Sequence, residues 1–147
     1  LSAVFDDAPM VMIVADKERR MLKVNRAAAK FAGKTAEEMI GLRSGDAFNC
    51  LHSHDHIDGC GYAAFCKRCH LKHNILETFT TGSRFQEEVR FFIDYGEKRE
   101  EFWLLISTAP IGTGEEQLVL ACWEDITRYK LAQEELAELK GPIETSG

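Results

Sequence analysis

Short apolar runs separated by polar segments predict a pair of strands near the start of the chain. Residues 11–15 are apolar and rich in β-branched side chains, and a second short run at 21–24 follows the charged segment 16–20. Two such runs around a polar connection are typical of a β-hairpin. We therefore predict two antiparallel strands in this region.

Capping signals predict two short helices directly after the hairpin. Asn25 can accept a hydrogen bond from an amide of a helix over residues 26–32, and Gly33 tolerates the left-handed backbone at its end. Thr35 and Glu38 have the spacing of a capping box, in which each residue bonds the backbone of the other. This pair predicts a second short helix that begins after Thr35.

The second half of the chain contains one longer helical pattern and three strand patterns. Residues 42–59 follow neither a helical nor a strand period, and we predict a loop there. Helical spacing returns over 69–79, where four apolar residues fall on one side: Leu71, Ile75, Leu76 and Phe79. Segments of strand character follow at 85–93, 99–110 and 117–124. The glycine-bearing connections between them predict consecutive antiparallel strands.

A charged helix over residues 129–140 is the last element that the pattern predicts. Its apolar residues recur at steps of three, four and three: Tyr129, Ala132, Leu136 and Leu139. This spacing is that of a coiled-coil seam, although it extends over barely two heptads. We interpret the end of the chain as frayed, so a folded domain over 1–128 precedes an outgoing helix and frayed linker over 129–147.

The order of these elements describes an α+β domain in which helices cover one antiparallel sheet. A length of 147 residues, with 45% hydrophobic and 29% charged residues, suits one soluble domain with a single core. The chain begins at Leu1 and is interpreted as a piece of a larger protein. It contains no nucleophile and base at motif spacing, no phosphate loop and no paired carboxylates in a recognisable context, so we do not expect an enzyme.

Charge and hydropathy exclude two classes of partner. The net charge of −6 would repel a phosphate backbone, and no basic stripe is interleaved with aromatic residues, which argues against nucleic acid. No run approaches roughly 20 consecutive apolar residues, and residues 1–10 lack the pattern of a signal peptide. We therefore expect no membrane segment in this piece and a cytoplasmic location.

Four segments, taken together, carry a resemblance to a known family: Phe5–Pro9, Val24–Ala28, Gly33–Gly41 and Trp123–Arg128. In this order and spacing they resemble a Per-Arnt-Sim (PAS) sensory domain of a bacterial signalling protein, over about residues 1–130. The last segment is similar to the Asp-x-Thr element that joins the final strand of that family to an outgoing signalling helix.

The resemblance implies a five-stranded antiparallel sheet with helices on one face, often with a ligand or cofactor held between them. It also implies a downstream effector in the parent chain, commonly a sensor histidine kinase of a two-component system or a cyclic-dinucleotide enzyme. The effector would be driven through the helix that follows Asp125–Thr127. The pairing habit of the family, together with the coiled-coil seam, implies a homodimer.

Four of the five cysteines gather in one segment of the chain, at Cys50, Cys60, Cys66 and Cys69. Thiolates two residues apart, as in the last pair, can turn onto one metal ion, and two more from the preceding loop can complete a tetrahedron. We therefore predict that these four residues bind zinc or an iron–sulphur cluster. The pattern also resembles that of a subgroup of PAS-type sensors with a four-cysteine loop, which does not identify the ligand.

Three other interpretations of the cysteines stay open. Cys66, Cys69 and His70 form a C-x-x-C-H motif that can attach haem covalently, although this leaves Cys50 and Cys60 without a role. Disulfides would form if the domain faced an oxidising compartment. The cysteines can also be reduced thiols, some of them buried as small hydrophobic residues.

Other candidate residues have simpler explanations than ligand binding. Three alternating histidines could act as substitute metal ligands, but a solvated polar loop is the preferred interpretation: His52, His54 and His56. Cys122, in an alternating strand, is expected in the core. Phe102 and Trp103 could line a ligand cavity, although packing is the simpler role.

These observations favour a sensory domain that responds to a redox, metal or small-molecule signal. An event at the cysteines would change the packing of helices on the sheet and so reposition the last helix. The alternative is a structural dimerisation or interaction module, in which the cysteine segment is a clip.

Overall fold

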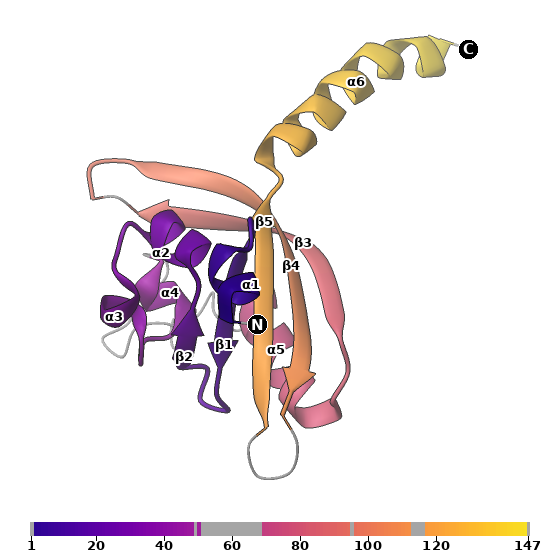
Figure 1. Cartoon of the computed structure of the whole chain (residues 1–147). Coiled ribbons are helices and arrows are strands. Elements are labelled where there is room, and N and C mark those ends of the chain that lie inside the picture. Colours follow the sequence, from indigo (N-terminus) through magenta and orange to yellow (C-terminus); the bar gives the residue numbers. More distant parts are fainter. Residues whose placement is uncertain (1, 49, 51–68, 95, 113–116, 147) are drawn as a thin grey trace.

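The five strands of the structure form one antiparallel sheet in the order β2–β1–β5–β4–β3 (Figure 1). The structure is a computed structural model, and it describes residues 2–48, 50, 69–94, 96–112 and 117–146. The strands are β1 (Val11–Ala15), β2 (Met21–Val24), β3 (Phe85–Asp94), β4 (Arg99–Ile111) and β5 (Leu118–Asp125).

Strand β1 joins the two halves of the sheet, because it pairs with β2 on one side and with β5 on the other. Ile13 lies opposite Val24 of β2 and opposite Ala121 of β5. The N-terminal hairpin and the three C-terminal strands therefore form a continuous surface. The prediction of one antiparallel sheet with five strands is confirmed.

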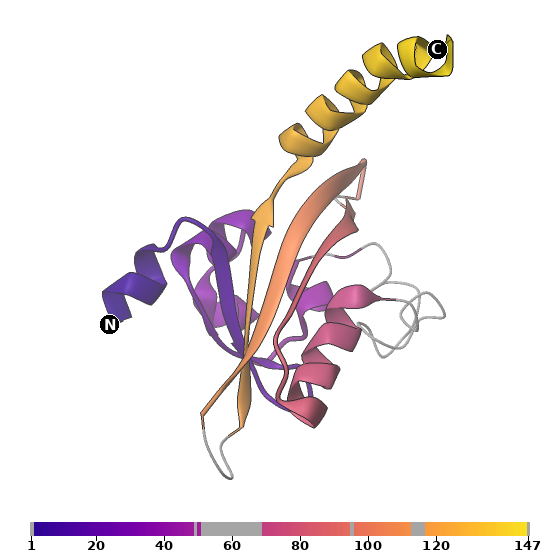
Figure 2. The same ribbon diagram turned by 90° about the vertical axis from the view of Figure 1, so that its right-hand side faces the viewer.

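The helices between β2 and β3 cover one face of this sheet, while the last helix, after β5, projects away from it (Figure 2). The helices are α1 (Ser2–Asp7), α2 (Arg26–Ala32), α3 (Ala36–Met39), α4 (Ser44–Ala47), α5 (His70–Thr81) and α6 (Thr127–Ser146). Side chains of α2, α3, α4 and α5 all enter the core cluster on the inner face of the sheet. None of the helices in the described ranges is long and apolar enough to cross a membrane.

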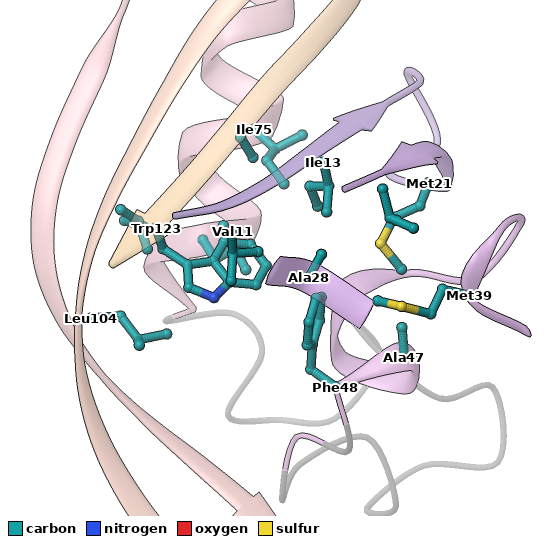
Figure 3. Packing of buried hydrophobic residues seen from close by; sticks show 14 of the residues in the cluster. Val11, Ile13, Met21, Ala28, Met39, Ala47, Phe48, Ile75, Leu104 and Trp123 are labelled. Carbon is teal, nitrogen blue, oxygen red and sulfur yellow. The ribbon is translucent and has the colours of Figure 1, made fainter. Parts of the chain in front are cut away.

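The core lies between these helices and the inner face, as Figure 3 shows for its central residues. Phe48 and Trp123 are 1% and 3% exposed, and their rings meet edge to face at 4.8 Å between centroids. Phe31 of α2 makes similar contacts with Phe48 at 5.7 Å and with Phe102 at 5.5 Å. Four separate parts of the chain are held together by this aromatic cluster, and each buried ring contributes roughly 2–3 kcal/mol of transfer free energy.

Both predicted N-caps are present with the expected bonds. The Asn25 side chain accepts from the Ala28 amide at the start of α2, and Gly33 ends that helix with a left-handed φ of 68°. The capping box of Thr35 and Glu38 is complete, with both reciprocal bonds formed. These short helices begin where the local signals predict, because a cap acts within a few residues of the chain.

The prediction of a loop over 42–59 is wrong for its first part, where α4 forms. This helix is only four residues long, and its N-cap Arg43 makes no side-chain capping bond. Long-range contacts stabilise it instead: Phe48 is buried in the core, and Lys34 Nζ donates to the Ala47 carbonyl at 2.6 Å. A helix held by such contacts has no pattern of its own in the sequence.

Both ends of the chain also differ from the prediction. Helix α1 had no counterpart among the predicted elements, although its last three residues belong to a segment that contributed to the family resemblance. Helix α6 starts at Thr127 and continues past Lys140 to Ser146, so residues 141–146, interpreted as frayed, are helical. The division of the chain near residue 128 stays a prediction.

Candidate functional site

The joint between β5 and α6 is built from a short set of hydrogen bonds around Asp125 and Thr127. Asp125 Oδ1 accepts from the Thr127 amide at 2.9 Å and from its hydroxyl at 2.5 Å. Thr127 Oγ1 in turn accepts from the Trp103 amide at 3.0 Å, and the Ile126 amide donates to the Trp103 carbonyl at 2.8 Å. The base of α6 is therefore tied to the backbone of β4.

A comparison of the sequence with protein families gives a result that agrees with this fold. The model of the family described as "PAS domain" matches residues 8–128. The chain belongs to the PAS domain family. No curated protein sequence matches it at a significant level.

Solved PAS domains share the same architecture at low sequence identity. The PAS domain of nitrogen regulation protein NR(II) from Vibrio parahaemolyticus is 14% identical, with a TM-score of 0.61 over 85% of this chain and 96% of that one. The PAS domain of BvgS from Bordetella pertussis is 21% identical, with a TM-score of 0.55 over 95% and 93%.

A further structure is a domain of the sensory box sensor histidine kinase/response regulator from Geobacter sulfurreducens, which is 21% identical. Its TM-score is 0.56 over 84% of this chain and 90% of that one. At such identities the likeness establishes the fold alone. Membership of a family of sensory domains gives the general function, and the signal has to be sought in the residues of this chain.

Two of the four predicted metal ligands lie in the described part of the chain, at the two ends of the cysteine segment. Cys50 forms an antiparallel bridge with Ile93 of β3, and its amide donates to the Gly45 carbonyl at 2.8 Å. Cys69 is the N-cap of α5 and packs against the core cluster. Both residues are half-buried. One end of the segment is thus bridged to the edge strand β3, and the other end begins α5, which covers the inner face.

The other predicted ligands lie outside the described residues. These are Cys60 and Cys66, the three alternating histidines at 52, 54 and 56, and the side chain of the proposed haem ligand His70. Within the described ranges, no group of three or more histidine, cysteine, aspartate or glutamate side chains could hold a metal ion. Convergence of the four sulphurs stays a prediction.

Cys122 is not in the core, contrary to the prediction. Along β5 the residues Val119, Ala121 and Trp123 are buried, so Cys122 points to the other face of the sheet, where it is half-buried. Desolvation there raises the pKa of its thiol, which disfavours the reactive thiolate. Because neighbouring residues of a strand face opposite sides, Cys122 and Trp123 could not both be core.

Buried polar groups between α5 and the sheet are the feature that the sequence interpretation missed. Thr78 of α5 shares a hydrogen bond of 2.9 Å with Thr108 of β4. Asn74 Nδ2 and the Trp123 indole nitrogen are buried donors that have no hydrogen-bond partner in the described part of the chain. Burying such a donor costs about 1–3 kcal/mol, and a hydrogen-bond acceptor next to it would remove that cost.

A signal for these groups was present in the helix pattern. Asn74 and Thr78 fall on the same side of α5 as the apolar Leu71 and Ile75, at helical spacing. Polar residues on the core-facing side of a helix indicate hydrogen bonding inside the core, because apolar packing alone does not require them. An open cleft of about 680 Å³ lies between α2 and β5, and Lys30, Phe31 and Trp123 contribute to its walls.

The two aromatic residues considered for a cavity lie on opposite faces of β4. Phe102 is on the inner face, in the aromatic cluster with Phe31. Trp103 is on the outer face, opposite Arg90 of β3. Arg90 Nε donates to Glu101 Oε1 at 2.6 Å, and this hydrogen bond is the main reason that the pKa of the Glu101 carboxyl is lowered. Both charged groups are exposed, so the pair adds little to stability.

Proposed function

We propose that this PAS domain is the input module of a larger signalling protein and that its output leaves through α6. The joint at Asp125 and Thr127 carries the proposal, because it connects α6 to the backbone of β4 beside Trp103. A change in the packing of helices on the inner face would reach the base of α6 through this strand. An effector of the histidine kinase class is supported by a similar domain from a sensor histidine kinase/response regulator; a cyclic-dinucleotide enzyme is the other class we consider.

For the input, we propose a thiol-dependent signal at Cys50, Cys60, Cys66 and Cys69, through zinc or an iron–sulphur cluster. The two described thiols support it, because Cys50 is bridged to β3 and Cys69 begins α5. Metal loss or thiol oxidation would therefore act directly on two elements that border the core. Such thiols require a reducing compartment, which fits a cytoplasmic location.

Replacing Cys60 by serine should release the metal that we propose while the sheet stays folded. Protein purified without oxygen should contain about one zinc ion per chain, or iron with visible absorption, because four thiolates complete one tetrahedral site or hold one cluster. Elemental analysis and an absorption spectrum measure the metal, and ¹⁵N–¹H spectra report the fold. Metal loss should also shift the amide signals of the first turn of α6.

The matched control for this experiment is Cys122→Ser, on the outer face of β5. It removes one thiol and should leave the metal content unchanged. Equal metal content in the Cys60→Ser and parent proteins, or a parent protein with neither zinc nor iron, would rule out the metal input. An amide shift confined to residues near the cysteines would leave the input intact and count against the output route.

We further propose that the domain forms a homodimer through α6. The predicted seam is exposed: Tyr129 is 58% exposed, Leu136 56% and Leu139 71%. These apolar side chains would be covered by the same helix of a second copy. If neither the cysteine input nor a small-molecule input is found while pairing persists, the domain is a structural dimerisation module, which is the alternative function.

Leu136→Glu should raise the dissociation constant of the dimer by at least about tenfold, because burying one leucine contributes about 1.5–3 kcal/mol. Sedimentation over a range of concentrations measures the constant. Glu135→Gln is the control, since it changes a neighbouring residue of the same helix outside the seam. A parent protein that stays monomeric at high concentration with α6 folded would exclude pairing.

A small-molecule input is the second candidate, and the two buried donors favour it. Asn74 lies one turn from Thr78 on α5, and Trp123 lies on β5 opposite Ile106 of β4, so the two donors are buried in the same core from different elements. A ligand with hydrogen-bond acceptors would satisfy them and remove their desolvation cost. Mass spectrometry of the protein under native conditions would detect such a ligand after purification.

A further inference from the structure

Lys130 makes a second connection between α6 and the sheet, one helical turn beyond the joint at Thr127. Its ammonium group donates to Glu88 Oε2 of β3 at 2.8 Å. The same group lies over the Trp103 ring, 4.7 Å from the ring centroid. One side chain of α6 therefore contacts the outer face of two neighbouring strands.

This contact differs from an ordinary surface ion pair in its burial and in its second partner. The Lys130 side chain is 21% exposed and that of Glu88 43%. A partly desolvated ammonium over an indole ring is attracted by the ring as well as by the carboxylate, and the indole is the strongest of the aromatic partners. Isolated exposed ion pairs contribute little to stability. The contact of Lys130 is stronger because the ion pair with Glu88 is combined with the cation–π contact to Trp103.

The joint alone does not determine the direction of α6. Its hydrogen bonds end at Thr127, and a helix attached only at its first residue can still pivot about that point. Beside Lys130, an open cleft of about 440 Å³ separates α6 from the sheet, with Leu131 and Glu134 on the helix side. Across this cleft Glu134 of α6 interacts electrostatically with Arg90 of β3, whereas Lys130 makes a hydrogen-bonded ion pair with Glu88 at 2.8 Å.

We propose that Lys130, with Glu88 and Trp103 as its partners, is a positioning residue that holds α6 in one direction relative to the sheet. We call these three residues the latch. Because Glu88 and Trp103 belong to neighbouring strands, a change in the twist or spacing of β3 and β4 would alter the latch and so the direction of α6. The proposal deepens the output route proposed above and rests on it for its biological meaning, but the geometry of the latch can be tested without any signal.

Residual dipolar couplings of the 147-residue chain measure the direction and the order of α6 relative to the sheet. In the parent protein, couplings from α6 and from the sheet should fit one alignment tensor. Lys130→Met keeps most of the side-chain length and removes the charge. It should lower the ratio of latched to unlatched helix by about tenfold, so that couplings of α6 shrink relative to those of the sheet.

Three further variants separate a positioning role from a merely structural one. Lys130→Arg should leave the couplings of α6 as they are in the parent protein, because an arginine can contact both the carboxylate and the ring. Glu88→Gln should loosen α6 without any change in the helix sequence. Arg128→Gln removes a charge from an exposed residue of the same helical turn and should change nothing.

The two tryptophan indole signals give an independent readout, since the chain has only Trp103 and Trp123. Lys130→Met and Glu88→Gln should shift the Trp103 indole signal, and Arg128→Gln should leave it in place. Raised salt should loosen α6 in the parent but have little further effect on Lys130→Met. Couplings that still fit the sheet tensor in both latch variants, with α6 helical by its ¹³Cα shifts, would overturn the proposal.

The same measurements in a Leu136→Glu background exclude pairing of α6 between copies as the cause of any order. If α6 stays ordered by the latch but metal loss leaves it unmoved, the latch stands and the proposed output route fails. If α6 is already free in the parent protein, the latch fails, while the metal and dimer proposals are judged on their own measurements.

Discussion

Asn25→Ala should lower the free energy of unfolding by about 3 kcal/mol, more than an ordinary N-cap replacement. The side chain is 1% exposed and makes three hydrogen bonds to the backbone. Its Oδ1 accepts from the amides of Met12 and Ala28, and its Nδ2 donates to the Met10 carbonyl. It therefore caps α2 and at the same time fixes the start of β1.

The reason for the large effect is that alanine would leave partners of Asn25 buried without a substitute. Thr35→Ala is the matched control, because Thr35 also caps a helix but its capping bonds are exposed. It should cost about 1 kcal/mol, as is usual for an exposed cap. Urea denaturation of both variants measures the difference. Equal losses would show that Asn25 acts only as a cap and not as a link to β1.

Phe48→Ala is expected to cost about 3–5 kcal/mol, because it removes a fully buried ring and leaves a cavity. Phe48 follows α4 directly and contacts Phe31 and Trp123. Its loss should also release the end of α4, where the Cys50 amide bonds the Gly45 carbonyl. Faster hydrogen exchange of the Cys50 amide, together with a lower denaturation midpoint, would report both effects.

Phe92→Ala is the control for this variant, since Phe92 is half-buried on the outer face of β3 beneath the Arg90 guanidinium. It should cost about 1 kcal/mol and leave the exchange of the Cys50 amide unchanged. If Phe48→Ala lowers stability without affecting that amide, α4 is held by contacts other than Phe48, such as the bond from Lys34 to Ala47.

Elements with local signals could be predicted closely from the sequence. The strands at 11–15 and 21–24 and the helix at 26–32 match the observed β1, β2 and α2 at both ends. A turn or a cap depends on residues that are near neighbours in the chain, so the same signals operate before and after folding. The family resemblance rested partly on such segments, and it is confirmed by the family model that matches residues 8–128.

Elements without local signals could not be predicted. Helix α4 has no side-chain cap, and its stability comes from the burial of Phe48 and from Lys34, more than ten residues away. Cys122 was also predicted on the wrong face of the sheet, because it was grouped with its neighbour Trp123. Contacts between distant parts of the chain decide the outcome for α4, whereas for Cys122 the strict alternation of the strand already excluded the prediction.

For the candidate site, the sequence by itself determined the family, the order of the strands along the chain and the identity of the thiols that we propose as ligands. Only the tertiary structure showed that Cys50 is bridged to β3, that Asn74 and Trp123 bury donors without partners, and that Lys130 reaches Glu88. Glu88 and Lys130 are 42 positions apart, and no pattern in a single sequence links such residues. Local propensities act over a few residues, whereas a latch or a buried polar group exists only once the sheet has brought distant strands and helices together.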